Sequence, residues 1–457
     1  MRIKELRLKN FRGFKELQIK FPESKLLVLV GINGAGKSSI LDCIAVFLSQ
    51  FVAKLCKRDP NENDVTITEN DINIDEKETI IDITLAYTPD PPAHSAMTAM
   101  EWGDDIDTNI IHWTITKSHS SKEPGSTLDM NLCFKDFYKS LQDDPDQDIP
   151  VFTYYQNQKI IPGKPSESMA TDYELDQFYA YENAFKKGVH DFGDFLTWFR
   201  NQEDWENEKK IENWKNEKKI EKVLDFVNNN LEIVRKAIGT FLGNIPSADF
   251  LHLRVMRQKK EKPFRFEASR ESSLVIDKAG KSLKIEQLSD GEKMLLLVVS
   301  DLARRLSIAN PRLGDALAGK GIVLIDEVDL HLHPQWQREV IPALLKTFPN
   351  CQFIVTTHSP QVLSNVEKEN VMILENFQVV EKTPFTYGRD SNSILYELMG
   401  VEERPAKVKH ELDKLYRLID DEKLEEARVE IKRLTEMLGE NDKEIVRANM
   451  YIDFQGA

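Results

Sequence analysis

The chain contains 457 residues, enough for about three domains of ordinary size. Its 61 lysines and arginines face 76 aspartates and glutamates, and the net charge of −15 argues against a protein that coats nucleic acid indiscriminately. The four cysteines have no metal-ligand spacing, so we do not expect a disulfide framework. Without a signal-peptide core or an apolar run of ~18 residues, the sequence predicts a cytoplasmic protein that does not enter a membrane.

Hydrophobic periodicity predicts an α/β fold assembled from two separated halves. The first half reads as two strands around a turn at residues 12–14, then a buried strand, a helix and further strands: Leu26–Val30, Ser39–Val52, 64–88, 109–117 and Val151–Tyr155. A charged, aromatic-rich helical stretch spans 172–245. The second half alternates strands with helices: Leu251–Val255, Phe264–Phe266, Leu274–Ile276, Gly291–Leu306, Ile322–Ile325, Trp336–Phe348 and Phe353–Thr356. After Ser393 nearly the whole chain has helical periodicity.

The segment Gly31–Ser38 (GINGAGKS) matches the pattern GxxxxGK[ST] in full, between a predicted strand and a predicted helix. Glycines let backbone N–H groups turn inward around phosphate oxygens, and the helix N-terminus adds a favourable dipole. The ammonium group of Lys37 can reach the β- and γ-phosphates, and the Ser38 hydroxyl can ligate Mg²⁺. This motif predicts a nucleotide-binding site.

Two further motifs indicate nucleotide hydrolysis. A predicted buried strand ends in Asp326 and Glu327. Beside a phosphate loop, the first carboxylate is placed to hold Mg²⁺ and the second to accept a proton from the attacking water. The segment Leu288–Lys293 (LSDGEK) opens a predicted helix, so Ser289 lies at a second anion-binding helix N-terminus. The same segment also reads as a simple capping box between Ser289 and Glu292.

Taken in order, the phosphate loop, LSDGEK, VLIDEVDLHLHP and TTHSP resemble the ABC-type ATPase heads. The branch resembled is shared by chromosome-maintenance and double-strand-break-repair ATPases and the overcoming-lysogenization-defect nucleases. It implies an α/β fold: an ABC-type P-loop ATPase head with mixed β-sheets, a helical insertion and a C-terminal helical tail. We divide the chain into the N-terminal half of the head, a mainly helical insertion, the C-terminal half of the head and the tail: 1–155, 156–250, 251–392 and 393–457.

The resemblance implies an ATP site formed between two protomers. Within one chain, Arg12 would touch the phosphates of ATP from the side. The phosphate loop and the start of the following helix would hold them through Asn33, Gly34, Gly36, Lys37, Ser38 and Ser39. Ser289 and Gly291 would bind the γ-phosphate held by the other protomer, and Asp329 would couple the two sites.

The resemblance also implies the residues that perform the chemistry. Glu327 would be the catalytic base, and His358 would contact the γ-phosphate. Mg²⁺ would be held by Ser38, by Asp326 and by a glutamine that follows a strand, either Gln156 or Gln158.

After His358 the chain has no Asp-x-Asp pair of the kind found in the second catalytic domain of overcoming-lysogenization-defect nucleases, so we expect no nuclease activity in this chain alone. Its length, short insertion and tail resemble the ATPase subunit of Septu-type anti-phage systems, including those attached to retrons. The resemblance implies an Mg²⁺-dependent ATPase that senses infection and controls a separate HNH-type nuclease. A homodimer or higher homo-oligomer would form through the ATP sites, and a retron reverse transcriptase with its RNA and DNA would be a further partner.

Two alternative functions, each from a different class of protein, stay open. One is a DNA-repair or recombination ATPase that loads or clamps on DNA, and the other is an ATP-dependent dimerising scaffold with little turnover. The basic stretch Leu253–Arg265 bears on the first alternative, because it reads either as a solvated hairpin tip or as a contact for nucleic acid or a protein partner.

The tail carries two apolar stripes at helical spacing, which we expect a short bundle to leave partly uncovered. They consist of Leu412, Leu415 and Ile419, and of Leu424, Ala427, Ile431, Leu434 and Leu438. The uncovered surface predicts a docking site for another chain, either a second ATPase or the nuclease.

Overall fold

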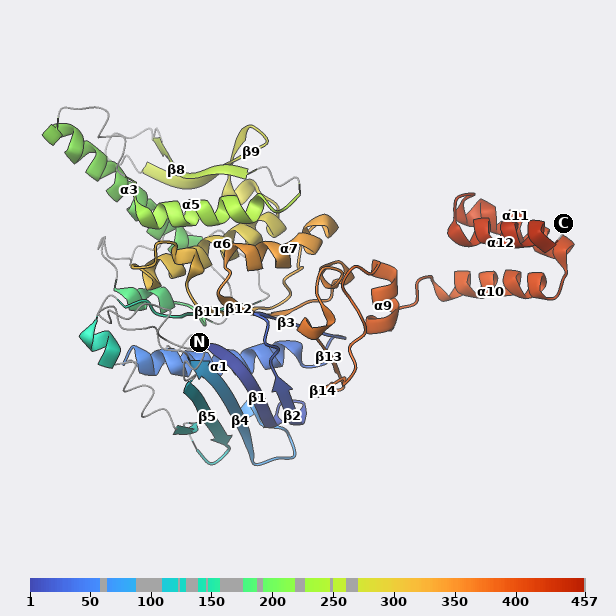
Figure 1. Cartoon of the computed structure of the whole chain (residues 1–457), viewed down its shortest axis with the longest axis horizontal. Helices are drawn as coiled ribbons and strands as arrows, with labels where there is room; N and C mark the ends of the chain where they lie inside the picture. Colours follow the sequence, from blue (N-terminus) through green and yellow to red (C-terminus); the bar gives the residue numbers. More distant parts are fainter. Residues whose placement is uncertain are drawn as a thin grey trace, which may run out of the picture. The chain divides into compact units, whose positions relative to one another are not determined.

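The computed structural model describes residues 1–57, 64–87, 109–121, 124–128, 139–144, 147–156, 176–186, 192–217, 227–246, 250–259 and 270–455. The chain forms two compact units, Met1–Arg389 and Asp390–Ala457, which we call the head unit and the tail unit (Figure 1).

A five-stranded antiparallel sheet forms one layer of the head unit, with the strand order β2-β1-β4-β5-β6. Its strands are β1 (Arg2–Phe11), β2 (Phe14–Lys20), β4 (Glu78–Tyr87), β5 (Asn109–Ser118) and β6 (Gly125–Leu128). In β4, buried and less buried residues largely alternate, as expected where one face of a sheet covers a core. The turn between β1 and β2 falls at Arg12 and Gly13, as the sequence predicted.

A six-stranded sheet forms the centre of the head unit, in the order β14-β13-β3-β12-β11-β7. Its strands are β3 (Leu26–Gly31), β7 (Val151–Tyr155), β11 (Gly321–Ile325), β12 (Cys351–Thr356), β13 (Val371–Glu375) and β14 (Gln378–Val379). All neighbours are parallel except β13 and β14. Since β7, β11 and β12 are buried along their whole length, they read as continuous apolar runs rather than as alternating ones.

Helix α1 (Lys37–Leu55) lies between the two sheets (Figure 1). Its Phe47 ring packs edge-on against Trp113 of β5, with 4.6 Å between the ring centroids. Phe51 packs against Phe152 of β7, with 5.5 Å between the centroids. Among the described helices, this one is long and apolar enough to cross a membrane by length and composition alone. However, 72% of its most apolar 18-residue stretch is buried inside the protein. Its apolar character is therefore explained by its place in the core.

On the other side of the central sheet, helices and a small sheet complete the head unit (Figure 1). The helices are α3 (Phe192–Glu217), α5 (Asn229–Leu242), α6 (Asp290–Ala309), α7 (Pro334–Thr347) and α8 (Pro360–Leu363), and the sheet has the order β10-β9-β8, with β8 (Phe250–Lys259), β9 (Arg270–Lys278) and β10 (Lys281–Lys284). Short 3-10 helices are η1 (Glu69–Asp71), η2 (Gln177–Tyr181), η3 (Ile285–Gln287), η4 (Ala316–Ala318) and η5 (Lys368–Asn370). The strand predicted at Phe264–Phe266 lies outside the described residues.

A buried ionic network ties α6 to the central sheet. The Asp301 carboxylate accepts hydrogen bonds from Arg304 and Arg305, each with a shortest distance of 2.6 Å, and from the Tyr155 hydroxyl at 3.0 Å. Arg305 also donates to the carbonyl of Ala180 at 2.7 Å. Burial alone would raise the pKa of Asp301, but the charges of Arg305 and Arg304 outweigh it and hold the pKa below its ordinary value. The carboxylate is therefore charged and fully paired inside the core.

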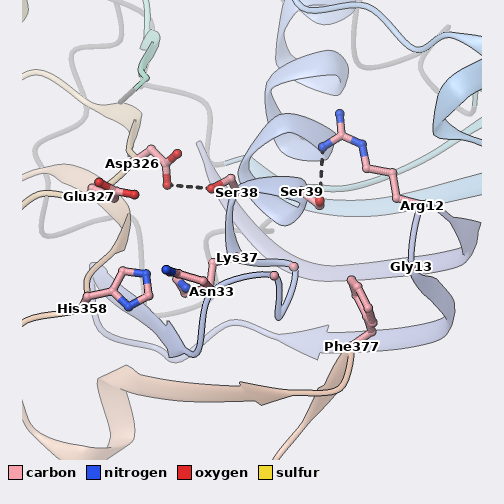
Figure 2. Close-up of a pocket in the computed structure, with 12 residues that line it drawn as sticks. Arg12, Gly13, Asn33, Lys37, Ser38, Ser39, Asp326, Glu327, His358 and Phe377 are labelled. Atoms are coloured by element: carbon pink, nitrogen blue, oxygen red, sulfur yellow. Dashed lines mark hydrogen bonds between the residues drawn. The ribbon is translucent and has the colours of Figure 1, made fainter. Parts of the chain in front are cut away.

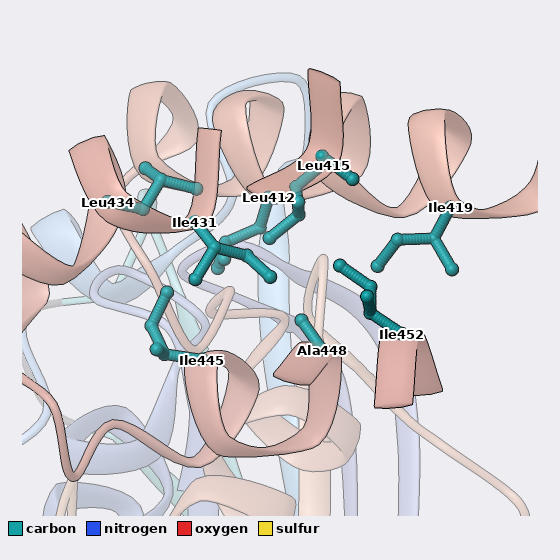
Figure 3. Close-up of a cluster of buried hydrophobic side chains, with 9 residues drawn as sticks. Leu412, Leu415, Ile419, Ile431, Leu434, Ile445, Ala448 and Ile452 are labelled. Atoms are coloured by element: carbon teal, nitrogen blue, oxygen red, sulfur yellow. The ribbon is translucent and has the colours of Figure 1, made fainter. Parts of the chain in front are cut away.

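The tail unit consists of α9 (Ser391–Met399), α10 (Ala406–Asp420), α11 (Leu424–Leu438) and α12 (Lys443–Gln455). Buried side chains of the last three helices form one cluster (Figure 3): Leu412, Leu415, Ile419, Ala427, Ile431, Leu434, Ile445, Ala448 and Ile452. Leu424 and Leu438 pack against it, partly buried. Most of the two stripes is therefore covered, because they pack on each other and on α12, while Leu424 and Leu438 at the two ends of α11 stay partly exposed.

The predicted fold class is confirmed. The chain has an α/β head with mixed β-sheets, helices between the two halves of the head sequence, and C-terminal helices. Parallel strands β3, β11, β12 and β7 all end at the same edge of the central sheet, which is where such sheets bind ligands.

Candidate functional site

The phosphate loop connects β3 to α1 and has the backbone conformation that its glycines allow. Gly34 and Gly36 have φ angles of 81° and 101°, in the left-handed region. Gly36 is the N-cap of α1, and a Cβ atom there would lie 2.3 Å from the Phe14 ring. Any residue with a side chain at position 36 would therefore have an unfavourable backbone conformation and would clash with the Phe14 ring.

A pocket of about 370 Å³ lies over this loop (Figure 2). Ten of its lining residues were predicted from the sequence: Arg12, Asn33, Gly34, Gly36, Lys37, Ser38, Ser39, Asp326, Glu327 and His358. Two lining residues, Gly13 and Phe377, were missed. The pocket thus combines the phosphate loop with residues that follow β11 and β12, about three hundred positions later in the chain.

A hydroxyl group of α1 and a carboxylate that follows β11 lie together where a hard cation could bind. The Ser38 hydroxyl donates to a carboxylate oxygen of Asp326 at 3.1 Å. The Thr356 hydroxyl donates to the same Asp326 oxygen at 2.6 Å and accepts from the backbone N–H of Glu327 at 2.7 Å. One hydroxyl and one carboxylate fit Mg²⁺, which completes its octahedron with water and phosphate oxygens.

Glu327 projects from a strained backbone position, since its φ angle of 51° is uncommon for a residue with a side chain. Burial and the neighbouring carboxylates of Asp326 and Asp329 raise the pKa of Glu327. A raised pKa makes a carboxylate a stronger base, which suits a group that must take a proton from water.

Lys37 and His358 complete the polar lining of the pocket. The Lys37 ammonium group donates to the carbonyls of Gly31 and Ile32 at 2.9 and 3.2 Å, and burial lowers its pKa. Burial and the charge of Lys37 lower the pKa of His358.

Arg12 lines the pocket, but its guanidinium group is held by carboxylates. It donates to Asp42 at 2.7 Å, to Asp71 at 2.8 Å and to the Ser39 hydroxyl at 3.2 Å. The Tyr154 hydroxyl donates to the other oxygen of Asp42 at 2.9 Å. These bonds use Nε and one terminal nitrogen of the guanidinium group, so a phosphate contact, as the resemblance implies, would use the other terminal nitrogen, Nη2.

The segment Leu288–Lys293, which we call the signature segment, forms the predicted capping box at the start of α6. The Ser289 hydroxyl accepts from the Glu292 N–H at 3.4 Å, and the Glu292 carboxylate accepts from the Ser289 N–H at 2.9 Å. A Cβ atom at Gly291 would lie 2.4 Å from the carbonyl oxygen of His331, so the helix start packs closely on the loop after β11. Ser289 and Gly291 do not line the pocket of their own chain, and their γ-phosphate role stays a prediction about two chains.

Two further predicted residues lie beside the pocket rather than in its lining. Asp329 accepts a hydrogen bond from the Thr357 hydroxyl, which links the loop after β11 to the segment that carries His358. Gln156 directly follows β7, whose last carbonyl, that of Tyr155, accepts from the Asp326 N–H at 2.9 Å. The alternative glutamine, Gln158, lies outside the described residues.

Residues 1–363 match the family model of the AAA ATPase domain. The chain belongs to this AAA ATPase family. The family assignment confirms the ATPase class that the motifs predicted, and ATP is the nucleotide it implies.

Individual relatives of this AAA ATPase carry more specific names. The chain is 28% identical to the retron Ec83 probable ATPase of Escherichia coli, over 99% of this chain and 87% of that protein. It is 32% identical to the Septu protein PtuA of Bacillus mycoides, over 35% of this chain and 23% of that protein. These similarities confirm the resemblance to retron and Septu ATPases. Among solved structures, an Smc head bound to the C-winged helix domain of ScpA is 19% identical, with a TM-score of 0.45, over 84% of this chain and 98% of that chain.

Proposed function

We propose that this chain is the ATP-hydrolysing subunit of a cytoplasmic anti-phage complex of the retron or Septu type. It senses infection and controls a separate HNH-type nuclease, with a retron reverse transcriptase and its RNA and DNA as a further partner. The observation that carries the ATPase part is that one pocket contains Lys37, Ser38, Asp326 and Glu327. The similarity to a retron probable ATPase and to the Septu protein PtuA supports membership in an anti-phage system.

In the proposed reaction, the residues of this chain bind the triphosphate and accept a proton. Lys37 and the backbone of the phosphate loop hold the β- and γ-phosphates. Ser38 and Asp326 would hold Mg²⁺, which supplies positive charge against the phosphate oxygens. Glu327 accepts the proton of the attacking water, and His358 contacts the γ-phosphate.

The complete site needs two protomers. Each chain has one phosphate loop and one signature segment, and Ser289 and Gly291 do not line the pocket over their own loop. In a homodimer, two head units would face each other in opposite orientations. The signature segment of each chain would then lie on the nucleotide of the other, with two ATP molecules per dimer. Higher homo-oligomers would assemble from such dimers.

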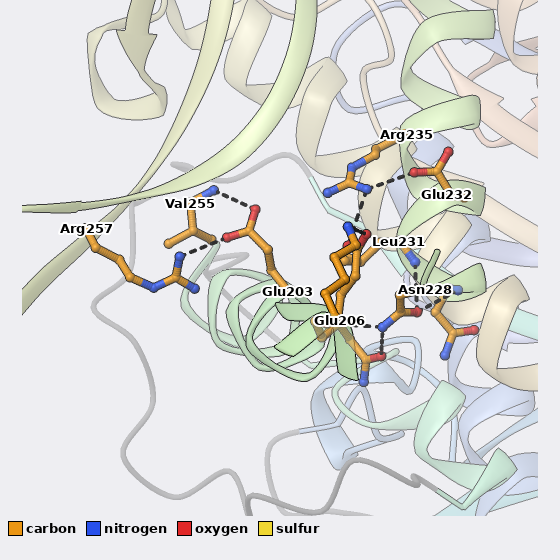
Figure 4. Close-up of polar contacts among 11 residues, drawn as sticks. Glu203, Glu206, Asn228, Leu231, Glu232, Arg235, Val255 and Arg257 are labelled. Atoms are coloured by element: carbon orange, nitrogen blue, oxygen red, sulfur yellow. Dashed lines mark hydrogen bonds and ion pairs between the residues drawn. The ribbon is translucent and has the colours of Figure 1, made fainter. Parts of the chain in front are cut away.

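The two arginines of the basic stretch whose side chains the structure describes are paired with carboxylates, so these two do not favour the DNA-loading alternative. Arg254 donates to both carboxylate oxygens of Asp277 at 2.7 and 2.9 Å. Arg257 pairs with Glu203 at 3.3 Å and also with Asp204, and the Glu203 side chain reaches back to the strand that carries Arg257 (Figure 4). The side chain of Lys259 and the residues from Lys260 to Arg265 lie outside what the structure describes.

Glu327→Gln tests the reaction. The amide keeps the shape of the side chain but cannot accept the proton, so kcat should fall by about 10²- to 10⁴-fold while ATP binding persists. The ATP-bound dimer should accumulate, which size-exclusion chromatography with light scattering measures. Glu381→Gln removes the same charge from an exposed position of the head unit and should leave turnover unchanged.

The pH dependence of wild-type turnover adds a second readout. Since Glu327 must be deprotonated and its pKa is raised in the nucleotide-free protein, kcat/KM should fall on acidification at a pH above 4.5, the ordinary pKa of a glutamate. Wild-type turnover in Glu327→Gln would refute the role of this residue. ATP-driven dimers without any turnover would instead support the scaffold alternative.

Neighbouring genes and co-purification test the partners. An adjacent gene for an HNH nuclease or a reverse transcriptase supports the defence complex, whereas a replication operon supports the DNA-repair alternative. Co-expression with the adjacent protein should give one complex whose mass includes both chains. Separate elution of the two proteins, with and without ATP, would contradict the proposed partnership.

A further inference from the structure

The pocket over the phosphate loop has two chemically different ends (Figure 2). Asp326, Glu327 and His358 lie at one end, next to Lys37. Arg12, Gly13 and Phe377 lie at the other end, beyond Ser39. The first end is charged, and the second presents an aromatic ring.

The direction of a bound nucleotide follows from these two ends. Lys37 reaches the β- and γ-phosphates, and the Mg²⁺-binding oxygens of Ser38 and Asp326 lie beside it. The γ-phosphate therefore belongs at the carboxylate end of the pocket. The ribose and the base must leave in the opposite direction, past Ser39 and toward the end that contains Phe377.

Phe377 is held at this end by the tip of a hairpin. Asn376 and Phe377 have φ angles of 49° and 60° and form the turn between β13 and β14. Such positive angles at both central residues are typical of a tight two-residue hairpin turn. Because β13 pairs with β3, the strand that leads into the phosphate loop, the hairpin fixes Phe377 relative to that loop.

The ring packs against the parts of the loop region that have no side chains. A Cβ atom at Gly13 would lie 2.3 Å from the Phe377 ring, and one at Gly36 would lie 3.1 Å from it. Phe14 packs edge-on against the ring, with 5.3 Å between the centroids and 86° between the planes. Phe377 is only half-buried by these contacts and lines the pocket with the rest of its surface.

We propose that Phe377 is the residue on which the base of the bound nucleotide stacks. This inference rests on the proposed ATP site and adds the contact for the base, which the motifs leave unassigned. Phe377 lies beyond residue 363, where the family match ends. Arg12, the other large side chain at this end, already lies over the Phe11 ring, with 5.2 Å from the guanidinium carbon to the ring centroid, whereas the Phe377 ring lines the pocket.

A purely structural role for Phe377 predicts a different result from a stacking role. If the ring only anchors the hairpin on Gly13 and Gly36, its loss weakens every ligand of the phosphate loop alike. If the ring stacks on the base, its loss weakens only ligands that have a base. The comparison of ATP and GTP with inorganic tripolyphosphate, each with Mg²⁺, separates the two roles.

Phe377→Ala in the full-length protein is the first test, with binding measured by titration calorimetry. Stacking of a base on an aromatic side chain predicts that the Kd values for ATP and GTP rise by about 5- to 150-fold. The Kd for tripolyphosphate should change by less than about twofold. Phe385→Ala is the matched control, because it removes an exposed ring of the same unit outside the pocket.

Phe377→Trp keeps an aromatic face and gives a spectroscopic readout if the alanine variant folds poorly. Relative to wild type, its additional emission should be quenched by ATP and GTP but not by tripolyphosphate, and ATP affinity should stay near the wild-type value. Equal weakening of ATP and tripolyphosphate in Phe377→Ala, or equal quenching by both ligands in Phe377→Trp, would overturn the inference. Lys37→Ala tests the proposed site separately, since it should weaken ATP and tripolyphosphate together.

Discussion

In the head unit, residues far apart in the sequence meet in one pocket, whereas the tail unit is assembled from helices that follow one another along the chain. Ser38 and Asp326 lie within 3.1 Å of each other although 288 positions separate them. The tail cluster joins α10, α11 and α12, which are consecutive. The unit that carries the chemistry therefore depends on long-range packing, and the other unit depends on local packing.

The two units also differ in how far the two partners of an ion pair are buried together. The head unit buries Asp301, Arg304 and Arg305, whose side chains are 10%, 3% and 5% exposed. In the tail unit, the partners Arg404 and Asp442 remain 20% and 15% exposed, around an apolar cluster. A buried charge that loses its partner costs far more than a surface charge does, so the units should respond differently to the loss of an ion pair.

The largest expected loss of stability is that of Asp301→Asn. This change leaves Arg304 and Arg305 buried without a counter-charge, and breaking such a pair costs about 3–5 kcal/mol. All six tryptophans precede residue 390, so tryptophan emission during denaturant unfolding reports on the head unit alone. Its midpoint should shift strongly toward lower denaturant.

Asp315→Asn is the control for this change. Asp315 pairs with Lys236 at 2.7 Å, but the two side chains are 48% and 57% exposed, and such pairs contribute at most about 1 kcal/mol. Equal shifts in the two variants would mean that the buried network adds no more to stability than a surface pair does, and the contrast between the units would fail.

Sequence patterns predicted the site where the chemistry depends on neighbouring residues. The phosphate loop, Asp326-Glu327 and the capping box of Ser289 are each contained within a few positions, and each has the predicted local conformation or place in the pocket. The fold class followed from strands and helices in alternation, because burial on both faces gives a strand a continuous apolar run.

Contacts that depend on tertiary pairing could not be predicted. Phe377 reaches the pocket only because β13 pairs with β3, and no motif surrounds it. The pairing of Arg12 with Asp71 likewise joins positions with no local pattern between them. In the tail, the stripes of α10 and α11 were recognised, but a stripe does not reveal what covers it, and the contribution of α12 was missed.

Leu415→Ala should produce the next largest effect, confined to the tail unit. Leu415 is fully buried in the tail cluster, and removing a buried leucine side chain costs about 2–5 kcal/mol. Far-UV circular dichroism should show the tail helices unfolding earlier, while tryptophan emission and the Kd for ATP stay unchanged. Val429→Ala, at a position that is 72% exposed on α11, should leave both signals in place. A loss of ATP binding in Leu415→Ala would show that the head unit depends on the tail core.

A smaller effect is expected for Arg404→Ala. One Arg404 nitrogen donates to both oxygens of Asp442, at 3.0 and 2.9 Å, and so links the segment before α10 to the start of α12. Because both groups keep contact with water, the loss should be at most about 1 kcal/mol by circular dichroism. Salt at 1 M should reduce the difference from wild type further, since it screens exposed charges over a few ångströms.

Lys443→Ala calibrates this measurement, because it removes a more exposed pair with Glu403 from the same unit. Its effect should be no larger than that of Arg404→Ala. A destabilisation by Arg404→Ala as large as that of Leu415→Ala, and insensitive to salt, would mean that the tail also relies on a desolvated ion pair. The two units would then share one source of stability, and their difference would lie only in how far apart their contacts are in sequence.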